Sequence, residues 1–314
     1  MPYSFEKRLL IGKIETVEGT DATPTVGSNA LITVGLDTSG LEADTRVRNT
    51  DGQYFGARPS INAQVRRPVR FGVEIAGSGV SAITPPAWMP FLRPAGFDAG
   101  TVGGSSVVQA PISAAVPTMT LWPYLDSLKM ASLGSRANLT MTFEDDEIPM
   151  FNLEYMGFPP SGILADSAPS TPTFAGQATP VICSTSNTTF TFDGYAFALR
   201  RLTINMGNKI EPRSLVGPTD KAMFRNREVT AELLVEMPTV ATKNPITKFE
   251  SRATGALQII HGTAAGNIVQ IDAARAETGV ITFPEEQGIV MMSIPLRFLP
   301  STATGNDEIT VTSK

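Results

Sequence analysis

The chain has 314 residues, 42% of them hydrophobic and 18% charged, which is enough for a packed core of one large or two ordinary domains. The formal net charge of −5 and the acidic balance exclude a protein that binds nucleic acid through a basic face. Cys183 is the only cysteine, so an intrachain disulfide framework is excluded and folding in a reducing compartment is expected.

The N-terminal stretch MPYSFEKRLLIGKIE carries charges on both sides of a very short apolar run, so we expect no signal peptide. No apolar run approaches the roughly 20 residues that a spanning helix needs, and membrane insertion is not expected. These features predict a soluble protein made in a cytoplasm.

Short alternating runs rich in Thr, Val, Ile and Phe, separated by Gly and Pro, indicate an antiparallel β protein. The strands expected in the first half are 9–15, 29–35, 69–76, 117–124, 127–133, 137–144 and 149–156. Those expected in the second half are 181–183, 188–192, 196–206, 228–237, 255–261, 267–272, 279–283 and 289–298. One short helix is expected in PAWMPFLRPAG, where Trp88, Phe91 and Leu92 form a one-sided apolar stripe.

Two polar segments, one in the middle of the chain and one at its C-terminal end, lack this alternation. Residues 159–180 are rich in Pro, Ser, Thr, Ala and Gly, and predict an interdomain linker that crosses a surface. The polar C-terminal tail STATGNDEITVTSK is expected to be exposed.

Two long segments, 36–66 and 207–226, join neighbouring strands without periodicity and are dense in mixed charge. Loops of that length in a compact domain are usually functional or disordered. They are either solvated loops or exposed arms that dock on polar surfaces of another subunit. The residues that would make such contacts are Asp44, Arg46, Arg48, Asp51, Arg58, Arg213, Asp220 and Arg225.

The pattern of the chain occurs twice. RRPVRFGVEIAG, from residue 66, and NREVTAELLVEM, from residue 226, align at an offset of 160 residues, so that Arg67 matches Arg227. PAWMPFLRPAG is echoed by PITKFESRATG, and Thr142-Phe143 is echoed by Thr282-Phe283 at an offset of 140. Similar phrases in the same order predict a duplication, with a first domain over 1–160 and a linker and second domain over 161–314.

Catalytic and metal-binding patterns are poorly represented. His261 is the only histidine and stands at a predicted strand end, so a structural role is favoured over a catalytic one. The acidic run from Glu144 to Glu147 lies between two alternating strands and reads as a solvated hairpin turn rather than a Ca²⁺ loop. No metal, cofactor or enzymatic activity is expected.

The strands 137–144 and 149–156 have one apolar and one polar face. The polar face is mildly acidic and contains no Lys or Arg within these strands. Ordinary solvent exposure explains the pattern, and so does a surface that must face a ligand without adhering to it.

Several phrases together resemble the major tail tube proteins of long-tailed bacteriophages. They are LLIGKIETVEGTDATPT, NALITV, GLEADTRVRNTDGQYFGARPS, RRPVRFGVEIAGSG and PPAWMPFLRPAGF, which cover most of the first half. The chain has Gly134-Ser135-Arg136-Ala137 where the typical pattern is Gly-Ala-Arg-Gly. The second half joins the resemblance through the internal repeat.

The resemblance implies a mainly β fold with two tandem related β-sandwich domains, each with a short flanking helix and a long loop. It implies stacked rings of six-fold or pseudo-six-fold symmetry, whose inner sheets close into a β-barrel tube that carries genomic DNA into the host. A chain with two fused units would need only three copies per ring. The polar residues that would face the lumen are Thr140, Thr142, Glu144, Asn152, Glu154 and Thr282.

The implied partners are further copies of the chain, a tape measure protein inside the tube, and tail terminator and distal tail proteins at its ends. The implied location is the virion, after assembly in the bacterial cytoplasm, with double-stranded DNA passing through without sticking. Two alternatives remain at this point: another virion, baseplate or surface β-sandwich that binds a receptor or glycan, and a carboxylate enzyme such as a glycosidase.

Overall fold

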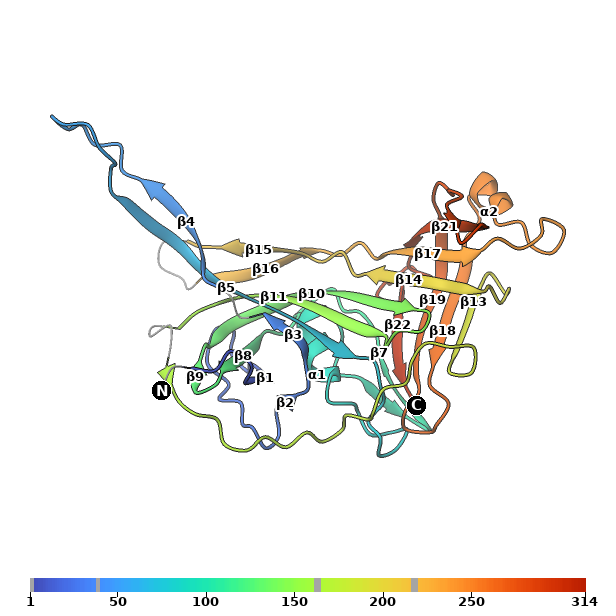
Figure 1. The fold of residues 1–314 in the computed structure, drawn as a ribbon, viewed down its shortest axis with the longest axis horizontal. Helices are drawn as coiled ribbons and strands as arrows, with labels where there is room; N and C mark the ends of the chain where they lie inside the picture. Colours follow the sequence, from blue (N-terminus) through green and yellow to red (C-terminus); the bar gives the residue numbers. More distant parts are fainter. Residues whose placement is uncertain (1–2, 38–39, 161–164, 216–219) are drawn as a thin grey trace.

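The computed structural model describes residues 3–37, 40–160, 165–215 and 220–314 and confirms a mainly β fold (Figure 1). The expected boundary at residue 160 adjoins 161–164, which lie outside the described residues. The first strands are β1 (Arg8–Ile14), β2 (Ala30–Leu31), β3 (Val34–Asp37), β4 (Glu42–Val47), β5 (Ser60–Glu74), β6 (Thr101–Gly103), β7 (Ser106–Gln109), β8 (Met119–Leu125), β9 (Leu128–Lys129), β10 (Ser132–Glu144) and β11 (Met150–Phe158).

The later strands are β12 (Ala165–Asp166), β13 (Thr188–Phe192), β14 (Leu199–Asn205), β15 (Lys209–Arg213), β16 (Lys221–Asn226), β17 (Thr230–Glu236), β18 (Gly255–His261), β19 (Val269–Thr278), β20 (Glu285–Glu286), β21 (Ile289–Phe298) and β22 (Thr310–Ser313). The helices are α1 (Met89–Leu92), continued by the 3₁₀ turn η1 (Arg93–Ala95), and α2 (Ile246–Ser251).

Eight antiparallel strands form one continuous layer, which we call the joint sheet. Their order is β3, β5, β11, β10, β14, β17, β21 and β19. The β10–β14 pair lies in the middle and joins strands from the two halves of the chain, from Thr140 opposite Asn205 to Glu144 opposite Arg201.

The strand pairings of the first half recur in the second half in the same order. The first strand set contains the pairs β1–β8, β8–β10, β10–β11, β11–β5 and β5–β3. The second strand set contains β13–β18, β18–β19, β19–β21, β21–β17 and β17–β14. Each set has a helix between its third and fourth strand along the chain.

The buried face of the joint sheet packs on two outer layers. β10 and β19 each bend at a bulge and take part in both layers, which is how strands turn the corners of a sandwich. The outer layer of the second set continues from β19 through β22 to β7 and β6, so strands inserted in the first half complete it.

The helix expected from the apolar stripe is confirmed as α1, and it fills the core of the first set. Trp88 is 2% exposed, donates its indole N–H to Ala76 O at 2.7 Å, and packs on Phe151 with ring centroids 4.8 Å apart. Phe91 meets Phe71 edge to face. Burial of such large rings supplies much of the hydrophobic free energy of this layer.

The two segments expected to be loops without periodicity are β-hairpins. β4 pairs with the first part of β5, and β15 pairs with β16; we call these the first arm and the second arm. Both arms project to the same side of the molecule (Figure 1). Their residues are mostly exposed on both faces, so no core face imposes the apolar alternation that marks a strand.

The expectation of an exposed C-terminal tail is confirmed for residues 301–304 and wrong for residues 308–313. β22 is buried between β19 and β7, and Ile309 and Val311 are fully buried. The expected strand at 181–183 is absent, and 279–283 contains a single bridge, between Thr282 and Ser293. Residues 127–133 are divided between β9 and the start of β10.

Replacing Ile309 by Ala should lower the free energy of unfolding by about 2–5 kcal/mol, because the substitution leaves a cavity in the packed C-terminal region. Chemical denaturation followed by fluorescence measures this. The matched control, Ile182→Ala, removes the same atoms from a side chain that is 46% exposed and should change stability by less than about 0.5 kcal/mol. Equal effects of the two substitutions would contradict the packed position of the tail.

Candidate functional site

The joint sheet has a polar face opposite its core, and five of the six lumen candidates lie on its regular strands. Asn138, Thr140, Thr142 and Glu144 alternate with buried residues along β10, and Asn152 and Glu154 do so along β11. Thr282 is exposed at the far edge of the second strand set, opposite Ser293. Neighbouring polar side chains bond to one another, as Asn152 Nδ2 does to Thr142 Oγ1 at 3.3 Å.

The polar face as a whole is not free of arginine, because other strands of the joint sheet contribute Arg70, Arg201 and Arg297. Arg201 lies opposite Glu144. Arg70 lies directly opposite Glu154, 3.2 Å from its carboxylate and 4.0 Å from that of Asp37. Arg297 is paired with Glu228 at 2.9 Å. Each of these two guanidinium groups has a carboxylate beside it, so its positive charge is largely neutralised locally.

The expected docking residues all lie on the two arms. Asp44 is on β4, 3.3 Å from Arg66 of β5, and Arg225 is on β16, 2.9 Å from Glu211 of β15. Arg46 and Arg213 are exposed on β4 and β15, whereas Arg48, Asp51 and Arg58 belong to the tip of the first arm and Asp220 precedes β16. The tip also exposes two aromatic residues, Tyr54 (78%) and Phe55 (109%).

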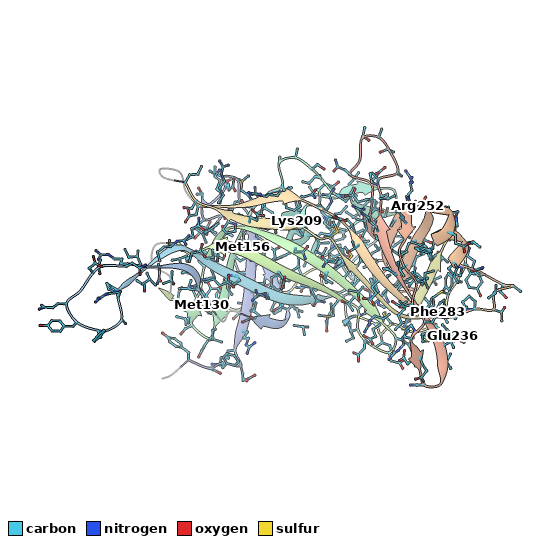
Figure 2. The ribbon with its side chains drawn as sticks, turned by 90° about the horizontal axis from the view of Figure 1, so that it is seen from above. Met130, Met156, Lys209, Glu236, Arg252 and Phe283 are labelled. Carbon is cyan, nitrogen blue, oxygen red and sulfur yellow. The ribbon has the colours of Figure 1, made fainter. Side chains whose placement is uncertain are left out.

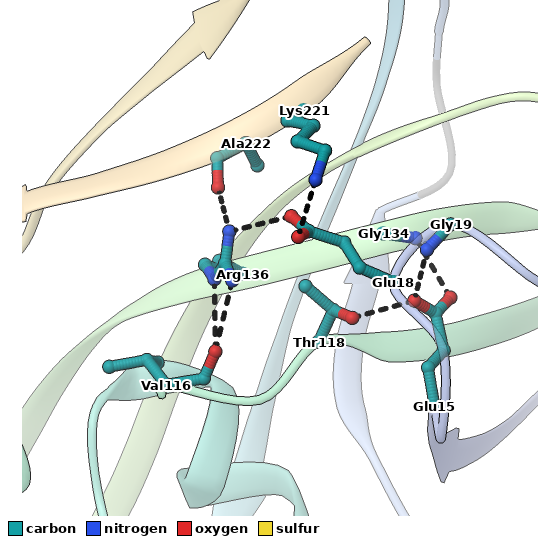
Figure 3. Close-up of polar contacts among 9 residues, drawn as sticks. All are labelled: Glu15, Glu18, Gly19, Val116, Thr118, Gly134, Arg136, Lys221 and Ala222. Carbon is teal, nitrogen blue, oxygen red and sulfur yellow. Dashed lines mark hydrogen bonds and ion pairs between the residues drawn. The ribbon is translucent and has the colours of Figure 1, made fainter. Parts of the chain in front are cut away.

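The outer part of the second arm is fastened to the first strand set by Arg136 (Figure 3). Its guanidinium donates to Ala222 O on β16, to Val116 O at 3.0 Å and to Glu18 Oε1 at 2.9 Å. Lys221, next to Ala222, adds an ion pair with the other oxygen of Glu18 at 3.2 Å. Charge-assisted bonds from one planar group to two carbonyls and a carboxylate fix the arm in one orientation.

The bulge that presents Arg136 is held by a buried carboxylate. Glu15 is 7% exposed and accepts bonds from Gly134 N (2.8 Å), Gly19 N (2.8 Å), and the hydroxyls of Thr118 and Thr120. Gly134 has φ +60°, a conformation that glycine adopts without strain. The phrase Gly134-Ser135-Arg136-Ala137 is therefore the bulge of β10 that aims Arg136 at the arm.

A second ionic contact joins the start of β17 to both the C-terminal region and the first strand set. Arg227 is bonded to Glu308 through Nε at 2.6 Å, and its Nη1 donates to Ile112 O at 2.9 Å. The side chains of Arg227 and Glu308 are only 8% and 11% exposed. Sequence reasoning missed Glu308 because it stands in a polar tail, and missed Glu18 because nothing local distinguishes it from a solvated acid.

The two helices differ in burial although they occupy corresponding places in the strand sets. α1 buries Met89, Phe91 and Leu92, whereas α2 buries none of its residues. α2 is held at the surface by Asp193, whose carboxylate lies 2.6 Å from Lys243 Nζ and 3.0 Å from Lys248 Nζ. Partial burial opposes ionisation of Asp193, but the bonds and charges of the two lysines outweigh it and lower its pKa.

His261, the only histidine of the chain, has a structural role. His261 is buried, donates from Nε2 to Val181 O at 3.1 Å, and accepts from the Thr188 hydroxyl at Nδ1. Burial lowers its pKa, so the ring is a neutral structural group. Within the described ranges, no three His, Cys, Asp or Glu side chains are grouped to hold a metal ion, and no helix is long and apolar enough to span a membrane.

The chain matches the model of a protein family described as phage tail tube protein over residues 5–310, nearly its whole length. It belongs to the phage tail tube protein family. Among curated proteins, none matches the chain significantly. Membership makes it a structural component of a phage tail and implies self-assembly into a tube; it also implies a structural rather than an enzymatic role.

The Arg136 contact predicts that Arg136→Ala loosens the second arm. Three oxygen acceptors lose a charged donor, and stability should fall by about 1–3 kcal/mol. Hydrogen–deuterium exchange of the monomer should show faster exchange over 209–226. The control Arg213→Ala removes an exposed guanidinium from the same arm and should leave the exchange there unchanged; if both variants behave alike, Arg136 does not anchor the arm.

Proposed function

We propose that this tail tube protein assembles as rings of three copies that imitate six-fold symmetry, and that these rings stack into the tube through which double-stranded DNA leaves the virion. The recurrence of five strand pairings in the same order carries the proposal. Two similar strand sets per chain, side by side in one sheet, make three chains equivalent to six units.

The domain division follows from the same observation. We propose a first tail tube domain over 1–160, and a linker with the second, duplicated domain over 161–314. The described part of the linker runs over the first strand set, where Thr173 N bonds to Val26 O and Ala178 N to Gly77 O. This path lets the second domain start beside the first without crossing the joint sheet.

Ring closure would satisfy the open edges of the joint sheet. No described strand pairs with the outer side of β3, and only one bridge supports 279–283 at the opposite edge. Unpaired backbone N–H and C=O groups at such edges favour pairing with another chain, and closure into a barrel removes the edges altogether. The joint sheets of three copies would then form the inner wall of the tube.

The polar face would line the channel. The proposed lumen residues, Thr140, Thr142, Glu144, Asn152, Glu154 and Thr282, include no basic residue, and Arg70 beside them is paired with acids. Arg201 of β14 also stands on this face, opposite Glu144. Because acids are placed opposite the arginines, phosphates would meet little positive charge that could release counterions on binding, so DNA could slide without adhering. No cofactor or metal is part of this function.

The arms would join successive rings. The first arm projects beyond the sandwich, and the second arm extends in the same direction along the first strand set. Their charged residues offer polar contacts, while Tyr54 and Phe55 offer apolar anchors. A contact between the arm side of one ring and another face of the next is heterologous and open-ended, which is how a filament grows. We further propose a tape measure protein inside the tube, terminator and distal tail proteins at its ends, assembly in the bacterial cytoplasm, and a long-tailed phage.

Cryo-electron microscopy of the purified protein at low and high concentration tests the ring. Hollow tubes whose rings contain three chains and six similar lobes are expected. Six chains per ring would keep the tube but overturn the pseudo-six-fold arrangement. A discrete particle that does not assemble, even with the phage's tail initiation complex added, would overturn the tube proposal in favour of a binding module.

The lumen assignment predicts that Glu154→Lys slows DNA ejection several-fold. The change removes the nearer of the two carboxylates beside Arg70 and places a second cation opposite it, so the local charge facing the DNA becomes positive. Ejection kinetics of phage carrying the variant measure this, and high salt should restore the rate. Glu6→Lys, an exposed change outside the joint sheet, is the control. Normal ejection by Glu154→Lys particles at low salt would show that β11 does not face the channel.

A further inference from the structure

The junction between the two strand sets has a defined register. Across it, Thr142 of β10 lies opposite Thr203 of β14, and Thr140 lies opposite Asn205. Beside it, α1 and η1 pack under the second arm, where Asn208 Nδ2 bonds to Ala95 O at 2.7 Å and Arg136 bonds to Ala222 O. The chain therefore contains one complete contact between neighbouring units.

The open edge of the second strand set corresponds to β10. Thr142 pairs with Met150, which pairs with Glu74 of β5; Thr282 pairs with Ser293, which pairs with Leu234 of β17. Leu234 stands 160 residues after Glu74, which is the offset that aligns β5 with β17. Thr282 of the second strand set therefore corresponds to Thr142 of the first. The position agrees with the match of the two Thr-Phe pairs in the sequence.

The open edge of the first strand set corresponds to β14. Val34 of β3 lies opposite Gly72, and Thr203 of β14 lies opposite Glu232, which is the residue 160 positions after Gly72. Asp37 opposite Arg70 likewise matches Asn205 opposite Thr230. Val34 therefore holds the place of Thr203.

Both edges expose side chains that a neighbour would cover. Val280 and Phe283 are 67% and 49% exposed at one edge, and Val34 is 47% exposed at the other. α2, with Phe249 40% exposed, borders a cavity of about 1070 Å³ that reaches Val280 and Thr282. Figure 2 shows Phe283 and Arg252 in the part of the molecule far from the arms. In the first strand set, the corresponding space is occupied by residues of the second strand set.

Arg275 supplies an independent correspondence. The Arg275 carbonyl accepts a hydrogen bond from Leu299 N at the point where β19 begins to pair with β21. Arg136 stands at the corresponding point of the first strand set, where β10 begins to pair with β11 after the bulge. Arg136 holds the second arm, whereas Arg275 is exposed and donates to Pro300 O at 3.2 Å. A guanidinium in this position is placed to donate a hydrogen bond to a backbone carbonyl of another arm.

We propose that the β10–β14 junction is repeated between chains, residue for residue. Residues 279–283, α2 and Arg275 receive β3 and the first arm of the next copy, with Thr282 opposite Val34 and Gly279 near Asp37. This inference rests on the proposed ring and specifies its interface. The occupant is a second copy because, within the chain, the equivalent edge of the first strand set, β10, is covered by β14 of the second strand set.

Disulfide trapping tests the register. In tubes of Val34→Cys/Thr282→Cys, directly opposite residues are close enough for a disulfide, and mild oxidation should give covalent trimers as the largest species on a non-reducing gel. The control Ile32→Cys/Thr282→Cys moves one cysteine two residues back, to an exposed position just before β3, and should crosslink poorly. Thr142→Cys/Thr203→Cys should form a disulfide within one chain without any gain in mass, and shows that the strand geometry accepts the bond.

The possible outcomes distinguish a wrong interface register from a wrong number of chains in the ring. Covalent trimers from the Val34/Thr282 pair support both, and a ladder reaching six chains supports the interface while overturning the three-chain ring. Tubes that form but crosslink only through Ile32, or through neither pair, overturn the proposed register and leave the tube function standing. Absence of rings and crosslinks under all assembly conditions overturns both.

Arg275→Ala provides a test without cysteines. It should raise the critical concentration for assembly roughly ten-fold while leaving the melting temperature of the monomer unchanged, because its proposed partner is on another chain. Arg297→Ala is the matched control, since Arg297 is paired with Glu228 inside the chain. An unchanged critical concentration for Arg275→Ala would exclude Arg275 from the interface.

Discussion

Satisfaction of backbone hydrogen bonds at strand edges is the constraint on which the architecture depends. Each strand set alone would expose two edges, and the chain removes one of each by pairing β10 with β14. β22 closes the outer layer in the same way, by pairing with β19 on one side and β7 on the other. The edges that stay open, β3 and 279–283, lie at opposite ends of one continuous sheet, where the proposed pairing between copies would continue the sheet instead of ending it.

The two strand sets differ where one has a neighbour within the chain and the other does not. α1 is buried beneath the second arm, but α2 depends on Asp193 and its two lysines to stay at the surface. Glu15 and Asp193 both follow the first strand of their set, yet Glu15 binds backbone N–H groups of a bulge and Asp193 binds lysines. An ion pair at a partly exposed site stabilises less than a packed core, so the second set keeps a surface that can still rearrange.

The sequence allowed the β class, α1, most strands and the repeat to be predicted, because those features have apolar residues at a regular period. Where burial is absent the period is absent too, which is why the arms read as loops although β4 and β15 are regular strands. The end of the tail was misjudged for a different reason. Its composition is polar, yet Glu308 is buried against Arg227 and the following strand completes a sheet. Contacts such as Arg136 to Ala222 join residues far apart in sequence and leave no local signal.

Charged residues on the polar face take part in sheet pairing and, if this face lines the channel as proposed, would also meet the passing DNA. Arg70 and Glu154 form a cross-strand pair that adds little to stability at an exposed site. In a channel the same pair has a second consequence, because the carboxylate keeps the guanidinium from acting as a phosphate ligand. If this face lines the channel, as proposed, it need not be devoid of arginine where an acid on a neighbouring strand neutralises the charge, as Glu154 does for Arg70. Selection for passage of DNA would then act on the pairing of charges across strands, which the register of the joint sheet determines.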